Sequence, residues 1–259
     1  MWHIIRAYLK FLWHSKNQYS IHSPFVFDLF TKCIYDKTSF PEYQILERFR
    51  GELLSDDTEI DVTDFGAGSR VFNSNRRKIS AIAKNAGISK KRAELLFRLT
   101  RFFKPEYVLE IGTSLGLATS ALSLGNPDAK ITTLEGCPET ASAAKKQLES
   151  FNLKNVELKI GEFAATIDSF DFRLSTFDLI YLDGNHQKEA TLQYFNLLLP
   201  TITNDTIWIF DDIHWSAEME QAWEIIKQNP NVTVTIDTFQ WGLVFFRKEQ
   251  QKQHFTLRA

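Results

Sequence analysis

The sequence has few cysteines, no long apolar run and no excess of either charge, and each absence excludes a class of protein. Its two cysteines, Cys33 and Cys137, lie far apart and cannot by themselves supply a disulfide framework or a metal cluster. No run approaches membrane-spanning length. The first stretch, MWHIIRAYLKFLWHSK, is interrupted by Arg6 and Lys10 and lacks a small-residue cleavage site. We therefore expect a cytoplasmic protein in a reducing compartment.

What is present is typical of a globular chain with an aromatic-rich core. The 259 residues include 30 basic and 32 acidic ones, 44% are hydrophobic and 14% aromatic. This length fits one large domain or one domain with a cap. For the apolar N-terminal stretch, packing onto the body of the protein is the favoured interpretation. An amphipathic helix on a membrane or a partner is the alternative, and a homodimer stays open.

Charge is unevenly distributed along the chain. Between Arg70 and Lys104 there are 11 Lys or Arg residues against one acid, Glu94, whereas the stretch from Glu42 to Asp64 is acidic. A basic stretch of this kind could bind RNA. Because the total charge is only −2, we favour a solvated basic face beside an acidic neighbour.

Short β-rich runs alternate with helical patterns after residue 89. Residues 89–103 predict a helix with Ser89 as N-cap, ended by Pro105. The strand-like runs are YVLEI, KITTLE, NVELKI, FDLIYLD and TIWIFDD, and VTVTID with WGLVFFR predicts a closing antiparallel hairpin. The pattern predicts a doubly wound, Rossmann-like, mostly parallel α/β sheet over 89–250, with a mostly helical cap at 1–88 and a tail at 251–259.

Two glycine loops compete as the ligand-binding loop. A nucleoside-binding loop should leave a strand, enter a helix, and be followed about 20 residues later by a strand that ends in a carboxylate. The loop at 107–116 meets these conditions, because Glu135 ends KITTLE nineteen residues after Gly116. The loop at 61–70, with Gly66 and Gly68, is followed by no second strand or suitably spaced acid. We interpret its glycines as turn residues, with a lid over the ligand as the alternative.

The chosen loop differs from a dinucleotide fingerprint. Its glycines, Gly112 and Gly116, follow a GxxxG spacing rather than GxGxxG, which disfavours pyrophosphate binding. Glu110 lies inside the preceding strand, where burial without a purpose would be costly. We expect its carboxylate to order the loop amides or to meet a cationic ligand.

In their order along the chain, VLEIGTSLG, TTLEG and FDLIYLDGNH resemble successive motifs of class I S-adenosylmethionine-dependent methyltransferases. The resemblance covers roughly residues 90–247. LIYLDGNHQKEAT followed by WIFDDIHW is most similar to the catechol and caffeoyl-CoA O-methyltransferases. The resemblance implies a methyltransferase sheet and S-adenosylmethionine as cofactor. The cofactor-binding residues that it implies are Glu110, Gly112, Thr113, Ser114, Gly116, Glu135, Gly136, Gly161, Glu162 and Asp183, with Phe163 beside the adenine.

Carboxylates at two strand ends are the candidates for the chemical step. Asp183 ends FDLIYLD, and Asp211 and Asp212 end TIWIFDD. Three carboxylates that converge at one sheet edge repel unless they are protonated, separated or bridged by a cation. In the resembling enzymes the matching positions ligate a divalent metal, where the usual pair is Asp-Asn. The resemblance thus implies a Mg²⁺-type site at Asp183, Asp211 and Asp212.

A base is also needed. His186 stands where the resembling family often carries a lysine, and a neutral imidazole can accept a proton near pH 7. His186 and Asp183 are thus the predicted catalytic residues, with His214 as an alternative base. Trp215 and Trp241 could wall an aromatic substrate, although core packing is the favoured interpretation for both.

The resulting functional prediction is methyl transfer from S-adenosylmethionine to an oxygen of a small molecule. The alternatives are methylation of a hydroxylated tRNA base and non-catalytic binding of S-adenosylmethionine or S-adenosylhomocysteine. The acceptor cannot be read from the sequence.

Overall fold

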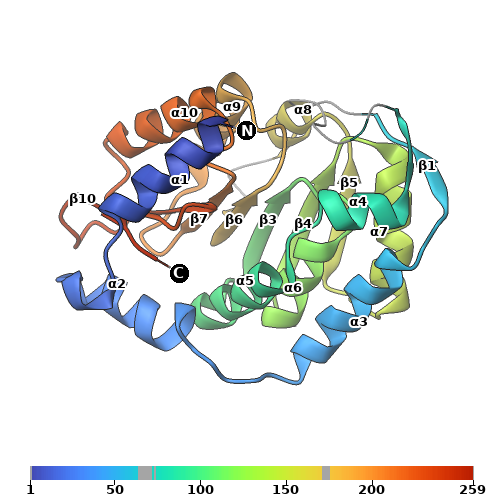
Figure 1. The fold of residues 1–259 in the computed structure, drawn as a ribbon, viewed down its shortest axis with the longest axis horizontal. Helices are drawn as coiled ribbons and strands as arrows, with labels where there is room; N and C mark the ends of the chain where they lie inside the picture. Colours follow the sequence, from blue (N-terminus) through green and yellow to red (C-terminus); the bar gives the residue numbers. More distant parts are fainter. Residues whose placement is uncertain (1, 64–71, 73, 171–175, 259) are drawn as a thin grey trace. The chain divides into compact units, whose positions relative to one another are not determined.

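The structure, a computed structural model, describes residues 2–63, 72, 74–170 and 176–258. Its contacts group the chain into two compact units (Figure 1), one of residues 37–166 and the other of residues 1–36 with 167–259. The predicted cap, residues 1–88, therefore contributes helices to both units.

The unit of residues 37–166 carries parallel strands in the order β3-β4-β5. Strand β3 is buried except at Tyr107, and nearly all of α6 is buried as well, as expected for strands covered on both faces. The elements of this unit are α3 (Glu42–Leu54), β1 (Glu59–Asp61), β2 (Arg76–Lys78), α4 (Ile79–Asn85), α5 (Lys90–Phe103), β3 (Tyr107–Ile111), α6 (Leu117–Gly125), β4 (Lys130–Glu135), α7 (Pro138–Ser150), β5 (Val156–Ile160) and, at its boundary, α8 (Phe163–Asp168).

The predicted helix at 89–103 is confirmed in position and in its cap. The Ser89 hydroxyl accepts a hydrogen bond from the amide of Arg92, which satisfies one free donor of the first turn of α5. The helix ends at Lys104, whose φ of 48° is left-handed. Because Pro105 disfavours a helical conformation in the residue before it, the chain leaves the helix here and enters β3.

The second unit carries strands in the order β6-β7-β9-β8-β10. β6 and β7 are parallel, and β9 runs antiparallel to β7 and to β8, so the predicted closing hairpin is confirmed. The elements of this unit are α1 (Trp2–His14), η1 (Gln18–Ser20), α2 (Pro24–Leu29), η2 (Phe30–Ile34), β6 (Leu179–Leu182), α9 (Lys188–Leu198), η3 (Leu199–Thr201), β7 (Ile207–Asp211), α10 (Ala217–Gln228), β8 (Val234–Asp237), β9 (Trp241–Phe245) and β10 (Gln253–Thr256).

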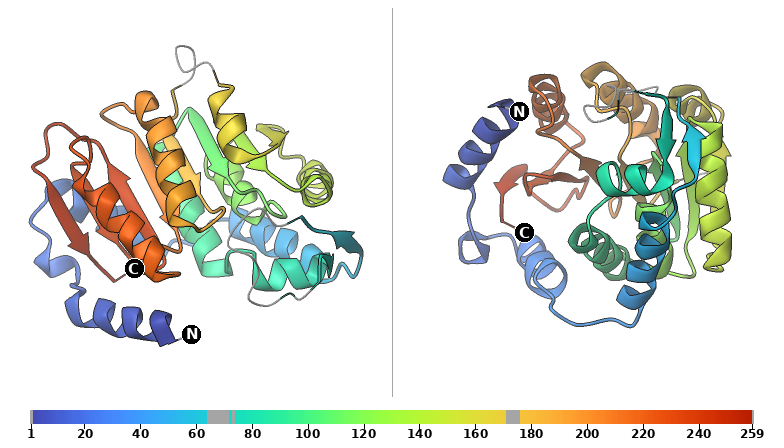
Figure 2. Two further views of the ribbon diagram at one scale, coloured as in Figure 1. Left: turned by 90° about the horizontal axis from the view of Figure 1, so that it is seen from above. Right: turned by 45° about the vertical axis from the view of Figure 1, so that its right-hand side comes forward.

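The segment predicted as a C-terminal tail contains a strand. Gln253–Thr256 pairs in parallel with β8, from Gln253 beside Val234 to Thr256 beside Asp237. Its polar sequence gives little local signal for a strand, and the pairing comes from the open edge that β8 presents. The mostly parallel architecture with helices around the strands, which Figure 2 shows from two further sides, is the predicted fold class.

Candidate active site

The glycine loop at 112–116 connects β3 to α6 in a conformation that needs its glycines. Gly112 has a φ of 103° and Gly116 a φ of 80°, values that side-chain-bearing residues rarely adopt. The amides of Gly112 and Thr113 both donate to the carbonyl of Leu134, each at 3.0 Å. The loop is therefore fastened to the end of β4.

Glu135 ends β4 and holds the same loop from its side chain. Its Oε2 accepts a hydrogen bond from the amide of Ser114 at 2.8 Å, and its Oε1 accepts one from the amide of Cys137 at 2.9 Å. A carboxylate oxygen can accept more than one hydrogen bond, so a pair of ribose hydroxyls could still donate to Glu135. The predicted loop and the predicted carboxylate are thus brought together.

Glu110 is fully buried and reaches the loop only through threonines. Its Oε2 accepts hydrogen bonds from the hydroxyls of Thr119 and Thr133, both at 2.5 Å, and Thr133 lies 2.6 Å from the hydroxyl of Thr113. Burial raises the pKa of Glu110 to about 8, which the two threonine hydrogen bonds only partly offset. At neutral pH this carboxyl is therefore mostly protonated and supports the loop from inside the core.

Gly161 and Glu162 follow β5 and continue the same edge. The amide of Gly161 donates to the carbonyl of Glu135 at 3.0 Å. Both carboxylate oxygens of Glu162 accept from amides in the first turn of α8, those of Ala164 at 3.0 Å and Ala165 at 2.8 Å. In this structure Glu162 therefore caps α8. Gly136 lies in the turn between Glu135 and Cys137.

The competing glycines, Gly66 and Gly68, lie outside the described residues. The loop at 107–116 has the predicted neighbours around it, which supports the choice made from the sequence.

In the same unit, the basic stretch and the acidic stretch before it meet in ion pairs: Arg76 with Glu59 at 2.7 Å, and Lys90 with Glu47 at 3.0 Å. These pairs favour the interpretation of a basic face beside an acidic neighbour.

In the other unit, the ends of β6 and β7 bring two predicted aspartates to one tyrosine. The hydroxyl of Tyr181 lies 3.2 Å from Asp183 Oδ2 and 3.1 Å from Asp211 Oδ2. A hydroxyl has one proton, so it can donate to only one of the two carboxylates at a time. Sequence reasoning missed Tyr181. The signal was available, because residues two apart on a strand share one face.

His186 lies beside the same aspartate. Its Nε2 is 3.5 Å from Asp183 Oδ1, and both side chains are partly exposed. The rings of His186 and Trp215 are 6.2 Å apart, so one tryptophan of the predicted substrate wall adjoins the predicted base. Trp241 is almost fully buried and meets the ring of Tyr181 edge-on at 6.0 Å, which agrees with a core role.

Three residues that follow β6 and β7 have strained backbone conformations. Asn185, His186 and Asp212 have φ angles of 70°, 45° and 52°, in the left-handed region that non-glycine residues seldom occupy. Such outliers cost about 1–3 kcal/mol each and persist where the surrounding structure holds them, often at functional sites. The strain supports a functional interpretation of the loop after β6 and the loop after β7.

The third predicted metal ligand, Asp212, does not complete a cluster. Within residues 2–63, 72, 74–170 and 176–258, no group of three or more His, Cys, Asp and Glu side chains is placed to hold a metal ion. Asp211 Oδ1 instead accepts a hydrogen bond from the amide of Asp212 at 2.7 Å. Asp183 and Asp211 each place a carboxylate oxygen within hydrogen-bond distance of the Tyr181 hydroxyl.

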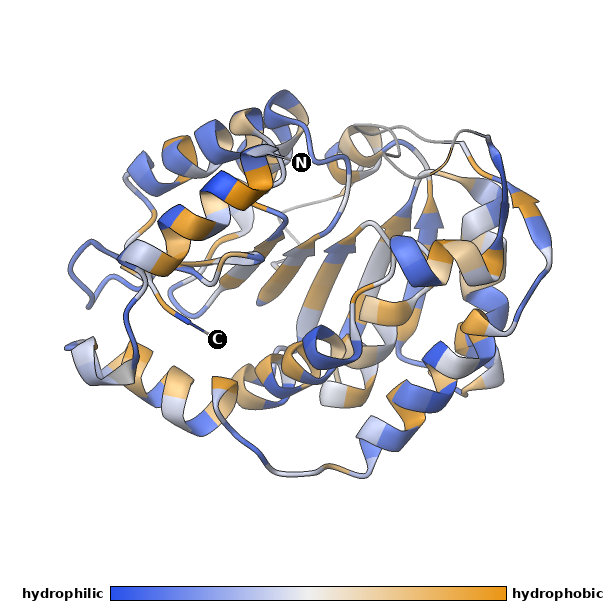
Figure 3. Cartoon of the chain, in the orientation of Figure 1, coloured by the Kyte–Doolittle hydropathy of each residue, from blue (hydrophilic) through white to orange (hydrophobic). Residues whose placement is uncertain are grey.

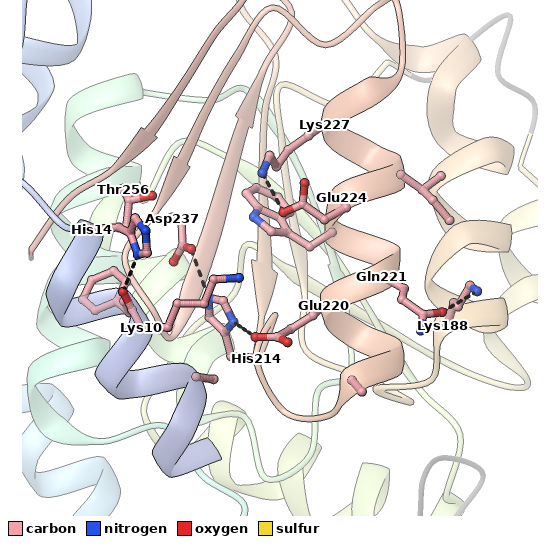
Figure 4. Close-up of a pocket in the computed structure, with 15 residues that line it drawn as sticks. Lys10, His14, Lys188, His214, Glu220, Gln221, Glu224, Lys227, Asp237 and Thr256 are labelled. Atoms are coloured by element: carbon pink, nitrogen blue, oxygen red, sulfur yellow. Dashed lines mark hydrogen bonds and ion pairs between the residues drawn. The ribbon is translucent and has the colours of Figure 1, made fainter. Parts of the chain in front are cut away.

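His214, the alternative base, is held by two acids. Its Nδ1 lies 2.7 Å from Glu220 Oε1 and its Nε2 lies 3.0 Å from Asp237 Oδ2 (Figure 4). Burial would lower the pKa of His214, but the hydrogen bonds and charges of Asp237 and Glu220 outweigh burial and raise it. A histidine whose two nitrogens both serve acids is poorly suited to accept a proton from a substrate. Its partners were not found from the sequence, although Asp237 ends a predicted strand.

His214 lines a pocket of about 780 Å³ within the second unit. Figure 4 shows side chains from α1, α10 and the end of β8 around it, with Lys227 paired to Glu224. The pocket lies beside the strained loop after β7, and α1 forms one of its walls through Ala7, Lys10 and Phe11.

The fold and the loop geometry are those of an α/β protein with a glycine loop at the carboxyl ends of its parallel strands, the edge at which such folds bind ligands. Comparison with known proteins makes this specific. Residues 109–213 match the family described as "Methyltransferase domain". The matched segment begins inside β3 and ends just after Asp211 and Asp212.

Solved structures share the fold. The chain is similar to the methyltransferase PaMTH1 of Podospora anserina, solved with S-adenosylhomocysteine, at a TM-score of 0.63 and 16% identity over 88% of this chain and 97% of that one. It is similar to the O-methyltransferase TomG of Streptomyces achromogenes, at a TM-score of 0.58 and 16% identity over 81% of this chain and 91% of that one. A putative caffeoyl-CoA O-methyltransferase of Staphylococcus aureus also matches, at a TM-score of 0.54 and 17% identity over 62% of this chain and 84% of that one. The predicted resemblance is confirmed at the level of fold and domain.

Proposed function

We propose that the protein is an S-adenosylmethionine-dependent O-methyltransferase that acts on a hydroxyl group of a small molecule. The observation that carries this proposal is the cluster of His186, Asp183, Tyr181 and Asp211 at the ends of β6 and β7. Neighbours that are O-methyltransferases, one of them solved with S-adenosylmethionine, support it.

The residues of the unit 37–166 fit the cofactor. Gly112 and Gly116 keep the loop backbone free of side chains where it turns, and a Cβ on Gly116 would lie 3.4 Å from Leu148. Glu135 fits the ribose hydroxyls, and the loop 112–116 fits the methionine part. When bound, S-adenosylmethionine supplies an electrophilic methyl group.

The chain's own part in the chemistry is to remove the proton of the acceptor hydroxyl. Asp183 Oδ1 lies 3.5 Å from Nε2 of His186, within ion-pair distance, and so favours the tautomer with a proton on Nε2. Nδ1 is then the proton acceptor. After transfer, the negative charge of Asp183 stabilises the imidazolium, and Tyr181 orients Asp183 by donating to it.

A divalent cation at Asp183, Asp211 and Asp212 remains a separate prediction. A cation or a shared proton would relieve the repulsion between the two carboxylates at the Tyr181 hydroxyl, but the described residues form no group of three or more side chains placed to hold a metal ion. No step of the proposed proton transfer depends on a metal. Assays in EDTA, with Mg²⁺ added back, test the cation prediction by itself.

Labelled S-adenosylmethionine, incubated with the enzyme and a small-molecule extract, identifies the acceptor. On that acceptor we expect His186→Ala to slow turnover by roughly 10²–10⁴-fold, as for the loss of a general base. Binding of S-adenosylhomocysteine should stay unchanged. His22→Ala, at an exposed histidine, is the matched control and should be fully active.

Three results would contradict the proposal. Full activity of His186→Ala would show that His186 is not the general base. Tight cofactor binding without turnover on any nucleophile would indicate a binding protein. Label that appears in co-purified RNA, and not in small molecules, would indicate the tRNA-base alternative.

A further inference from the structure

Helix α1 has an inner face that fixes it to its unit. Ala7 and Phe11 are buried, and the rings of Tyr8 and Phe11 lie 4.8 and 5.5 Å from the ring of Phe239. Near its start, His3 Nε2 is 3.6 Å from Glu220 Oε2. The helix is therefore anchored along its length, as the favoured sequence interpretation predicted.

The outer face of α1 is apolar and exposed. Trp2, Ile5, Leu9 and Trp13 are 86%, 48%, 62% and 87% exposed. Their spacing of three, four and four residues places them in one stripe along the helix. Figure 3 shows apolar and hydrophilic residues alternating along α1. Single exposed apolar residues are ordinary, but a continuous stripe with a tryptophan at each end marks an interaction surface.

The charged residues of α1 that flank this stripe are both basic. Arg6 and Lys10 are exposed and lie one turn apart, and Lys10 also lines the pocket of Figure 4. The sequence from residue 1 to residue 27 contains no Asp or Glu, the first acid being Asp28. A second copy of the same stripe would place cations against cations. The partner that complements this face is apolar inside and negatively charged at its surface.

We propose that the stripe of Trp2, Ile5, Leu9 and Trp13 docks the protein on an anionic lipid bilayer, with α1 lying in the plane of the interface. Tryptophan is enriched at the boundary between headgroups and acyl chains, where its ring is both apolar and polar. Basic residues beside the stripe attract anionic headgroups. A convex helical ridge enters a fluid bilayer without needing a matching groove.

The length of α1 agrees with surface binding. Its 13 residues span roughly 20 Å at 1.5 Å per residue, less than the hydrocarbon core of a bilayer. Among the described residues, no helix is long and apolar enough to cross a membrane. The inner face stays packed on the unit, so docking leaves the fold unchanged.

Co-sedimentation with vesicles tests the proposal. The protein should sediment with vesicles of phosphatidylcholine mixed with phosphatidylglycerol, and much less with phosphatidylcholine alone. Leu9→Glu should weaken binding at least about tenfold, because it puts a charge in the apolar stripe. Arg6→Gln should weaken it about fivefold, as expected for one basic contact to an anionic surface.

Ile160→Gln is the matched control, because Ile160 is 54% exposed on β5, in the other unit. It should bind vesicles like the unchanged protein. Unchanged thermal unfolding midpoints show that each variant is folded. In addition, tryptophan fluorescence should shift to the blue on adding anionic vesicles, and the shift should shrink in Trp13→Gln.

Three outcomes would overturn the proposal. The first is no binding to either vesicle, and the second is equal binding to both. The third is a dimer, measured by light scattering without lipid, that Leu9→Glu dissociates, because the stripe would then belong to a second copy of the chain.

Discussion

Replacing Glu110 by Gln should change how the stability of the protein depends on pH. Burial raises the pKa of Glu110 from 4.5 to about 8. Between these two values the folded chain keeps a proton that the unfolded chain releases, so stability falls as pH rises. The slope is about 1.4 kcal/mol per pH unit, and it flattens above the folded pKa.

The glutamine variant lacks this titration but has a fixed cost. Glu110 Oε1 is buried, with no hydrogen-bond partner among the described residues. An amide nitrogen in its place would leave donors unsatisfied, at about 1–3 kcal/mol. Thr119 and Thr133 can still donate to the remaining oxygen. We therefore expect the variant to be the less stable protein at pH 5 and the more stable one at pH 8.

Urea unfolding at pH 5, 6, 7 and 8, followed by circular dichroism, measures the difference. The unfolding free energy of Glu110→Gln minus that of the unchanged protein should rise by about 3–4 kcal/mol from pH 5 to pH 8. Glu157→Gln, on the exposed part of β5, should give a flat difference. If the difference in unfolding free energy for Glu110→Gln were equally independent of pH, the conclusion that Glu110 is buried and protonated would be refuted.

Three further predictions concern the loop, the ribose carboxylate and His214. Gly112→Val should abolish binding of S-adenosylhomocysteine in calorimetry, because valine strongly disfavours a φ of 103°; normal affinity would mean that the wrong loop was chosen. Glu135→Ala should weaken the same binding by about 1–3 kcal/mol, and equal or better affinity for NAD in the unchanged protein would refute the cofactor. His214→Gln should destabilise the chain most at pH 6 and below, since the raised pKa of His214 gives stability that is present below its unfolded pKa of about 6.5 and is lost as pH rises through the folded value. Thermal midpoints of both proteins at pH 6 and pH 9 check this, and a larger loss at pH 9 would contradict it.

The sequence by itself was enough for the fold class and for pairing the loop at 112–116 with Glu135. Strand runs such as YVLEI and FDLIYLD are local apolar patterns, and Ser89 and Pro105 are local helix signals, so they need no tertiary information. The spacing from Gly116 to Glu135 is likewise readable along the chain. Hydrogen bonds from the loop to Leu134 and Glu135 agree with it.

Only the tertiary structure decided what the polar groups do to one another. Glu110 is mostly protonated at neutral pH because it is fully buried, and the pKa of His214 is raised because Glu220 and Asp237 lie against its two ring nitrogens. Strand β10 exists because β8 leaves an edge to pair with, although its own sequence is polar. Burial, charge proximity and edge pairing depend on residues far apart in the chain, and for that reason local patterns could not show them.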